Sequence, residues 1–319
     1  MKNMTLPLIA AVAAISATPS FADVTFGGYG RFGVMHIDDD STGISSTDVT
    51  SRFRLQIDAT AEADNGVIFG ARARIQQNNT DNQQSINAGP DGVLGTADDF
   101  ASNSGPAGTG LNGIRYFARY GSTEFGVGNI YGALETMPGQ YPIDLGLTSL
   151  GFDYTAYAFR ADAYSSTGAG ASGANGVEVL HRSGDLEVHV SASETNDRIA
   201  GYAAYDYQGW TFALGLQDSN NPGDTELTAS ASGQVGLADV TVAYADNGIA
   251  GDHFVVAGRF DVGSATAVEA YVADAQAFDK ASYGVGVHHD LGGGTSFRSG
   301  IASLGNKDVR ADAGVRFNF

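Results

Sequence analysis

Five arginines near the start of the chain are spaced so that their charges could act together on charged solutes. They are Arg31, Arg52, Arg54, Arg72 and Arg74. Arg52 and Arg54 stand two residues apart, so in a strand their side chains leave the same face about 6.8 Å from each other. Like charges at this distance repel, by roughly 0.6 kcal/mol in water. Folding does not need this repulsion, so we expect a positive wall that acts on charged solutes. The alternative is a set of scattered solubilising charges on a wet surface.

A long acidic segment, residues 132–174, offers the opposite charge. Its carboxylates are Glu135, Asp144, Asp153 and Asp162, and its only basic residue is Arg160. The segment is also rich in leucine, tyrosine and phenylalanine, which a segment surrounded by water would not need. A connection of this length without a strand pattern is usually functional in a compact protein. We therefore expect the segment to pack against the rest of the fold.

The elements that carry the arginines are predicted to be strands, because apolar and polar residues alternate with a period of two. In residues 51–62 the odd positions from Phe53 to Ala61 are apolar, and the even positions from Arg52 to Thr60 are polar. Turn sequences such as the Asp-Asn-Gly at 64–66 separate runs of this kind. The pattern predicts sixteen strands, near residues 24–36, 51–62, 67–77, 111–120, 123–131, 175–183, 185–194, 199–207, 209–218, 226–236, 238–246, 252–262, 264–274, 281–290, 294–303 and 308–319.

Physical arguments place these strands in a membrane. A lipid-facing arginine at the midplane would cost roughly 2–4 kcal/mol, so the arginine faces must line water. Strands of about 9–12 residues exceed the ordinary length and suffice to cross a bilayer when tilted. Aromatic residues gather near strand ends, as at Tyr205, Tyr207 and Trp210. An open sheet edge would leave backbone groups unpaired in hydrocarbon, so the sheet must close. The predicted fold class is an all-β, 16-stranded antiparallel transmembrane β-barrel with water inside.

The composition and the first residues of the chain further limit the possible protein classes. The chain has no Cys, which excludes a disulfide-stapled fold. Its formal net charge of −19 argues against nucleic acid as a partner. Residues 1–22 combine Lys2, a short apolar stretch and small residues before Asp23, which predicts a secretory signal peptide. The alternative is a frayed N-terminal helix. The mature barrel domain is expected over residues 23–319.

Short motifs add a family resemblance. GYGRFG at 28–33, SRFRL at 51–55 and FGVGN at 125–129 resemble, in order and spacing, the general porins of Gram-negative bacteria, especially the purple-bacterial type. The resemblance covers the whole mature chain. It implies a passive outer-membrane diffusion channel for small hydrophilic solutes and ions, and not an enzyme. It also implies a homotrimer in the outer membrane of a Gram-negative bacterium.

The same resemblance implies how the two charged groups meet. In that family the third loop folds into the barrel and narrows the pore, so residues 132–174 are the expected pore-constricting loop. Acidic groups on that loop face basic groups on the opposite wall, and the resulting field screens solutes by charge. The expected acidic side is Glu135, Asp144, Asp153 and Asp162, and the expected basic side is the five arginines. Further arginines on polar faces, at heights that the sequence leaves open, are Arg115, Arg119, Arg310 and Arg316.

The expected partners are those of an outer-membrane protein. They are membrane lipid and lipopolysaccharide, further copies of the chain in a trimer, and the barrel-assembly machinery. The last strand ends in Phe319, with Phe317 on the same face, and such an end is similar to the assembly signal of outer-membrane barrels.

Passive diffusion requires no cofactor, but one connection could hold a structural calcium ion. Asp91, Asp98 and Asp99 lie close together among glycines. Closely spaced carboxylates can wrap Ca²⁺ with oxygen ligands, although the bidentate Glu of an EF-hand is missing here. The alternative is a solvated turn. His288 and His289 are adjacent in a predicted strand and point to opposite faces, which argues against a joint metal site.

Three other functions stay open on the sequence. A substrate-specific outer-membrane porin would carry binding groups along its pore. An outer-membrane barrel enzyme would need a catalytic group at the rim, and Ser, His and Asp show no recognisable grouping here. A secreted β-sandwich or adhesin would be soluble without detergent. A hydrolase assay and detergent-free solubility distinguish the last two from a channel.

Overall fold

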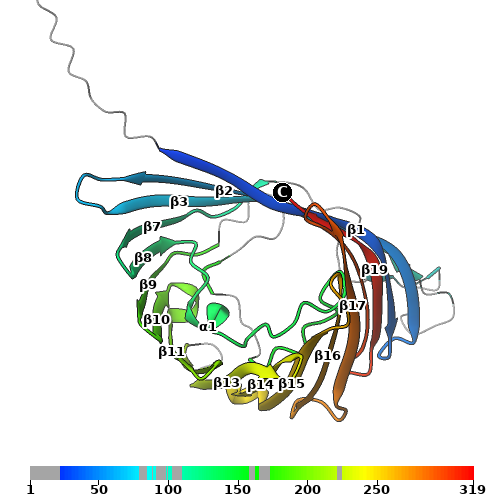
Figure 1. Cartoon of the computed structure of the whole chain (residues 1–319). Helices are drawn as coiled ribbons and strands as arrows, with labels where there is room; N and C mark the ends of the chain where they lie inside the picture. Colours follow the sequence, from blue (N-terminus) through cyan, green and yellow to red (C-terminus); the bar gives the residue numbers. More distant parts are fainter. Residues whose placement is uncertain are drawn as a thin grey trace, which may run out of the picture.

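The strands follow one another round a closed ring (Figure 1). The computed structural model describes residues 22–78, 85–87, 89–90, 98, 100–102, 110–157, 162–164, 173–220 and 225–319. The ring closes because β1 (Asp23–Asp39) pairs with β2 (Ile44–Glu62) on one side and with the last strand, β19 (Val309–Asn318), on the other. Both pairings are antiparallel, and no hydrogen-bonding edge is left exposed there to lipid.

The number of strands agrees with the prediction. The main sheet has 17 strand segments, of which β6 and β7 form one interrupted strand because both pair with β3. Counted once, they leave sixteen strands among the described residues. The remaining members of the ring are β3 (Ile68–Asn78), β6 (Gly110–Leu111), β7 (Arg115–Tyr120), β8 (Thr123–Gly128), β9 (Gly176–Ser183), β10 (Leu186–Ser193), β11 (Arg198–Tyr207), β12 (Trp210–Asp218), β13 (Glu226–Val235), β14 (Ala238–Asp246), β15 (Asp252–Asp261), β16 (Thr266–Ala275), β17 (Ser282–Gly292) and β18 (Thr295–Ser303).

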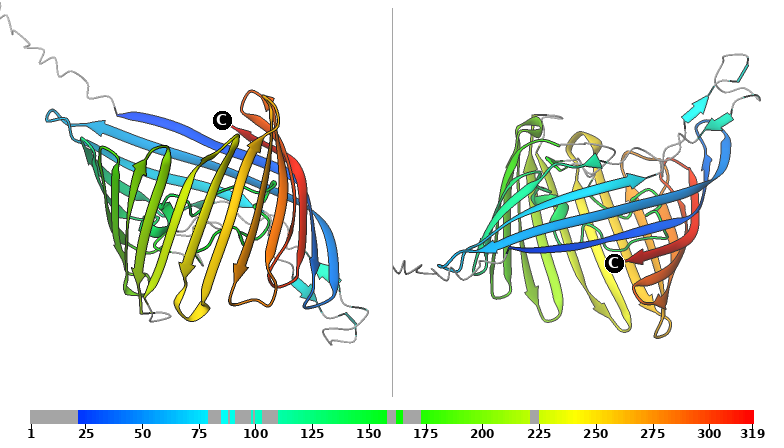
Figure 2. Two further views of the ribbon diagram at one scale, coloured as in Figure 1. Left: turned by 60° about the horizontal axis from the view of Figure 1, so that its bottom comes forward. Right: turned by 90° about the horizontal axis from the view of Figure 1, so that it is seen from above.

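The two ends of the barrel differ in their connections (Figure 2). At one end the turns are tight, and Gly121 and Gly184 adopt positive φ of 55° and 58° there, which glycine does without strain. At the other end the connections are longer. One of them carries a small two-stranded sheet of β4 (Ser85–Asn87) and β5 (Phe100–Ser102), and others carry single turns of helix, η1 (Thr195–Asp197) and η2 (Gly248–Ala250).

The first hairpin is longer than the alternation predicts. Strands β1 and β2 have 17 and 19 residues and remain in register from Asp23 paired with Thr60 to Asp39 paired with Ile44. The alternation fades over residues 38–48 because serine, threonine and aspartate occupy both faces there. Polar residues on both faces suit strands that continue past the apolar band into water, so the period of two no longer marks the strand.

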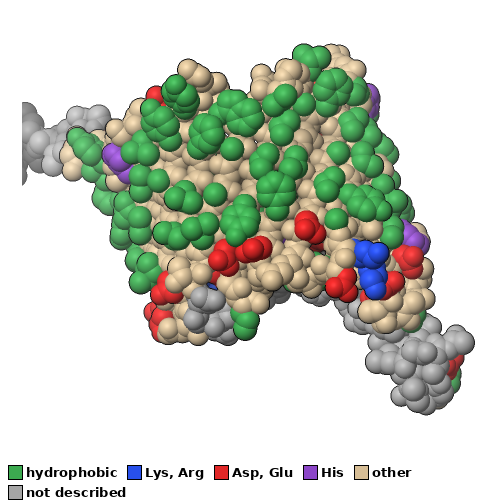
Figure 3. Space-filling model, turned by 90° about the horizontal axis from the view of Figure 1, so that it is seen from below, with side chains coloured by type: hydrophobic (Ala, Val, Ile, Leu, Met, Phe, Trp, Pro, Cys, Tyr) green, Lys and Arg blue, Asp and Glu red, His purple; other side chains and the backbone are tan. Residues whose placement is uncertain are grey.

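The outer surface of the barrel is apolar, as a lipid-facing surface must be. Large apolar side chains such as Phe32, Phe53, Ile199 and Phe212 are exposed, although a soluble protein would bury most of them. Figure 3 shows hydrophobic side chains as a broad green band over one side of the barrel, with most of the charged side chains of that side gathered below the band. The alternation therefore holds on the outside as predicted. No helix among the described residues is long and apolar enough to cross a membrane.

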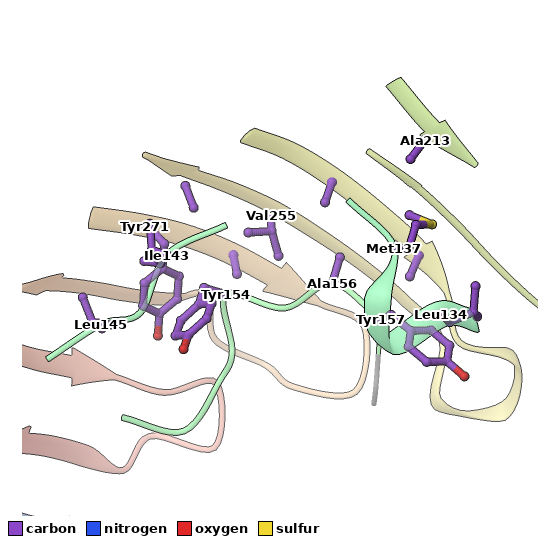
Figure 4. Close-up of a cluster of buried hydrophobic side chains, with 14 of the residues drawn as sticks. Leu134, Met137, Ile143, Leu145, Tyr154, Ala156, Tyr157, Ala213, Val255 and Tyr271 are labelled. Atoms are coloured by element: carbon purple, nitrogen blue, oxygen red, sulfur yellow. The ribbon is translucent and has the colours of Figure 1, made fainter. Parts of the chain in front are cut away.

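The inner surface departs from the simple pattern. Several inward positions of β11 to β16 carry alanine, and these alanines are buried because the segment that follows β8 covers them. That segment begins with one helical turn, α1 (Ala133–Thr136), and its described residues up to 157 run inside the ring of strands (Figure 1). Its apolar side chains, among them Leu134, Leu145 and Tyr154, belong to the same buried cluster as these alanines (Figure 4). Burial of each such side chain contributes about 1.5–3 kcal/mol, which explains the apolar composition of the segment.

Candidate pore constriction

Three arginines lie side by side on the inner wall. In the strand register Arg31 is directly opposite Arg316 on one side and Arg52 on the other. Neighbouring strands are about 4.8 Å apart, so the three arginines stand side by side across three strands. Sequence alone placed Arg31 and Arg52 on a polar face, but it could not give the height of Arg316. Pairing of the last strand with the first brings Arg316 into the row.

Tyr29 sits among these arginines and helps to hold them. The guanidinium of Arg316 lies 4.2 Å from the centre of its ring, and that of Arg54 lies 5.6 Å away. Arg52 donates from Nη1 to the Tyr29 hydroxyl at 3.4 Å. Such cation–π contacts contribute about 0.5–2 kcal/mol each. The ring therefore fixes positive side chains that would otherwise repel one another.

Asp144, at the middle of the inward segment, is the carboxylate that meets the arginine wall. Its Oδ2 lies 2.5 Å from Arg298 Nη1 and 3.0 Å from Arg316 Nη1. Burial opposes ionisation, but these two guanidinium groups hold the pKa of Asp144 below its ordinary value. Arg298 was not singled out from the sequence, although it occupies a polar position of the predicted strand 294–303. The sequence shows that Arg298 lies on the polar face of a strand, but only the folded structure shows that it meets Asp144.

The other three predicted acidic residues lie in different surroundings from Asp144. Burial raises the pKa of Glu135 to about 8, although Arg74 favours its ionised form. Asp153 accepts hydrogen bonds from Ser282 Oγ and from the backbone N–H of Gly305, so it ties the segment to β17 and to the connection after β18. Asp162 is buried beside the start of the segment, and burial raises its pKa. Of the four predicted carboxylates, Asp144 is the one that forms ion pairs with arginine among the described residues.

The remaining wall arginines also divide their roles. Arg72 pairs with Asp58 at 2.6 Å, so its charge is largely balanced within the wall. Arg31 is buried and donates from Nη1 to the carbonyl of Leu147 at 2.7 Å. Arg74 donates to the hydroxyl of Tyr164 at 2.5 Å. The five arginines therefore do not form one uniform wall of exposed charge, because some of them hold the segment.

Arg74 joins the residue that precedes the segment to a residue near the end of the segment. Its guanidinium lies 4.9 Å from the ring centre of Tyr131 and 5.1 Å from that of Tyr164. The two rings are themselves 4.4 Å apart. Tyr131 precedes the segment and Tyr164 lies in its returning limb, so one side chain of β3 clamps both.

The tip of the segment is anchored on the last strand. The backbone N–H groups of Leu147 and Thr148 and the Thr148 hydroxyl all donate to the Asp312 carboxylate, at 2.9, 2.7 and 2.7 Å. Asp312 was not singled out from the sequence, since an inward aspartate resembles any other polar position of a wet wall.

The further arginines named from the sequence are paired with acids. Arg115 bonds Glu124 and Glu178, each at 2.6 Å, while Arg119 also bonds Glu124. Arg310 lies 3.3 Å from Asp308. Pairing of this kind balances the charges of Arg115, Arg119 and Arg310 within the wall. Arg316, the fourth of these arginines, instead lies in the row beside Arg31.

The predicted calcium residues fall mostly outside the part of the chain that the structure describes. Asp91 and Asp99 lie outside it, and only Asp98 is described. No cluster of three metal-ligating side chains occurs among the described residues. His288 points inward, where Nε2 bonds the Asp144 carbonyl, and His289 points outward to Thr266, so the two histidines face opposite sides as predicted.

The closed ring, its apolar outer band and the charged groups inside it define a transmembrane channel protein. Comparison with known proteins gives the family. A family model described as Gram-negative porin matches residues 9–309. The chain therefore belongs to the Gram-negative porins, and it is an outer-membrane diffusion channel. Members of this family are channels rather than enzymes.

Individual relatives agree with this assignment. The chain is 27% identical over 322 residues to a porin of Fuscovulum blasticum, with 93% of this chain and all of that one covered. It is also 27% identical over 335 residues to a porin of Rhodobacter capsulatus, at the same coverage. A solved triple mutant of the Rhodopseudomonas blastica porin has the same fold, with a TM-score of 0.77, 24% identity, and coverage of 93% of this chain and all of that one.

Proposed function

We propose that this channel admits small hydrophilic solutes and ions without substrate specificity and screens them by charge at a constriction formed by residues 132–174. The observation that carries the proposal is the contact of Asp144 with Arg298 and Arg316, which sets a carboxylate of the segment against the arginine row. Opposed charges create a transverse field. Water and dipolar solutes orient in that field, whereas apolar solutes cannot replace the ordered water.

The mechanism needs no catalytic group, energy source or moving part, and we propose no enzymatic activity. Solutes diffuse down their gradients through the space that the segment leaves open. The basic side consists of Arg52, Arg54 and Arg316 with Arg298. Arg31, Arg72 and Arg74 contribute less, because the Leu147 carbonyl, Asp58 and the tyrosines respectively engage them. On the acidic side Asp144 is the principal charge, since Glu135 is largely protonated at neutral pH.

Reversal potentials in planar bilayers under a salt gradient test this proposal. Replacing Asp144 with Asn removes the negative side and should shift selectivity toward anions. Replacing Arg298 or Arg316 with Gln should shift it toward cations. Arg119→Gln is a matched control, because Arg119 lies near a tight turn and pairs with Glu124. Equal reversal potentials for Asp144→Asn, Arg316→Gln and the control would remove these residues from the constriction.

We further propose that the protein works as a homotrimer, that residues 1–22 are removed as a signal peptide, and that Phe319 is read during barrel assembly. Native mass spectrometry of the purified protein tests the first two together, through the mass of the assembly and of its chain. Deletion of Phe319 should lower the amount of folded protein in the outer membrane. A structural calcium ion at Asp91, Asp98 and Asp99 stays a prediction, and calcium-dependent thermal stability would test it.

A further inference from the structure

Among the described residues of the inward segment, two large aromatic side chains remain exposed. Tyr141 is 43% exposed and Phe152 is 44% exposed, whereas Leu145 and Tyr154 of the same segment are at most 1% exposed. The segment lies inside the ring of strands, so these two rings meet water and not lipid (Figure 1). Burial of apolar surface therefore does not explain why a phenylalanine stands at position 152.

The backbone at Phe152 is unfavourable for a large side chain. Phe152 has φ of +66°, and the three residues before it, Ser149, Leu150 and Gly151, also have positive φ. Glycine accepts this region readily, but a bulky residue there is a genuine outlier. Strain of this kind persists where the surrounding structure holds it, and it clusters at ligand sites. The chain thus keeps an exposed aromatic ring at a position that glycine or asparagine would occupy with less strain.

The two exposed rings form a corner that packs against further aromatic rings. Tyr141 and Phe152 meet edge to face, with ring centres 6.3 Å apart and an interplanar angle of 79°. The ring centre of Tyr154 lies 5.8 Å from that of Phe152, and the ring centre of Tyr271 of β16 lies 5.6 Å from that of Tyr154. Figure 4 shows Tyr154 and Tyr271 together in the buried cluster that fixes the segment to the strands. The corner is therefore held by the barrel wall.

The turn that carries Phe152 is hydrogen-bonded to charged groups. Ser149 accepts from the backbone N–H of Phe152 at 3.1 Å and donates from Oγ to Asp144 Oδ1 at 2.9 Å. Asp144 in turn contacts Arg298 and Arg316. The backbone that presents the Phe152 ring is thus connected, through Ser149, to a carboxylate that accepts hydrogen bonds and to guanidinium groups that donate them.

We propose that Tyr141 and Phe152 form a stacking site for pyranose sugars on their way through the channel. A pyranose has an apolar C–H face that can lie on an aromatic ring and hydroxyls at its rim that can bond a carboxylate and guanidinium groups. The inference rests on the proposed function, since the sugar must first enter the pore. The site holds the sugar weakly, as a transport pathway requires, because release must be fast for passage to continue.

Current block by a linear glucose oligomer tests the proposal. Maltotriose is added to single channels in planar bilayers, and the half-blocking concentration is measured against the sugar-free current of the same variant. We expect a saturable block in the native protein. Phe152→Leu and Tyr141→Leu keep apolar bulk but lose the ring face, and each should raise the half-blocking concentration about fivefold. Phe152→Tyr keeps the ring face and should stay near the native value.

Two controls make the outcome decisive. Tyr283→Leu changes an equally aromatic side chain on the outer face of β17, and it should leave the half-blocking concentration unchanged. Sorbitol has similar hydroxyls but no ring, and it should block far less than maltotriose. Equal block by sorbitol, or an unchanged value in both leucine variants, overturns the stacking site while the channel itself stands. Absence of any ionic current would instead overturn the proposed function.

Discussion

The Asp312 anchor permits the sharpest test of how the segment is held. The carboxylate accepts three hydrogen bonds from the tip, two from the backbone N–H groups of Leu147 and Thr148 and one from the Thr148 hydroxyl. In Asp312→Asn one carboxylate oxygen becomes an NH₂ group that faces a donor. At least one bond to a charged acceptor is lost, and such bonds contribute about 1.5–3 kcal/mol each.

This loss should be visible as movement of the tip. A change of about 3 kcal/mol corresponds to a factor of about a hundred in the ratio of released to anchored tips. Single-channel recordings should therefore show many more brief transitions between conductance levels in Asp312→Asn than in the native protein. Asp279→Asn is the matched control, since Asp279 is exposed in the connection between β16 and β17.

Equal behaviour of the two variants would contradict a role for Asp312 in holding the tip. If Asp312→Asn and Asp279→Asn give the same transition frequency, and both proteins are folded by circular dichroism, the tip is held by something other than these bonds. The packing of Leu145 against β17 and of Leu150 against β18 would then be the first alternative, because both side chains are buried there.

Three further predictions follow from the same structure. Raising the pH from 6 to 9 should increase cation selectivity, because the Glu135 carboxyl, with its pKa raised to about 8, is neutral below that pH and gains its charge above it; Glu135→Gln should abolish this change in reversal potential. Arg74→Lys keeps the charge but loses the flat contact with Tyr131 and Tyr164, so the reversal potential should hold while transitions between conductance levels become more frequent. Leu145→Ala should weaken docking of the segment by about 2–5 kcal/mol and make it more sensitive to added protease, whereas cleavage at the native rate would show that Leu145 contributes little.

The sequence by itself determined the architecture of this protein. Alternation with a period of two fixed which side chains face lipid and which face the interior, as the outward Phe53 and the inward Arg52 illustrate. The need to leave no edge in hydrocarbon then required closure, and the pairing of β1 with β19 confirms it. Local pattern succeeds here because the face of a side chain in a strand depends only on its parity.

The tertiary structure alone decided the arrangement of the site. Parity carries no information about height, so only the strand register could place Arg316 beside Arg31 and reveal Arg298 as a partner of Asp144. The path of the segment depends on the alanine surface contributed by strands far away in the sequence. For that reason four equivalent-looking carboxylates could not be ranked from sequence. Asp144 alone among the described members of that set pairs with the wall arginines, while Asp153 serves as a tether, because hydrogen-bond partners are fixed only when distant strands come together.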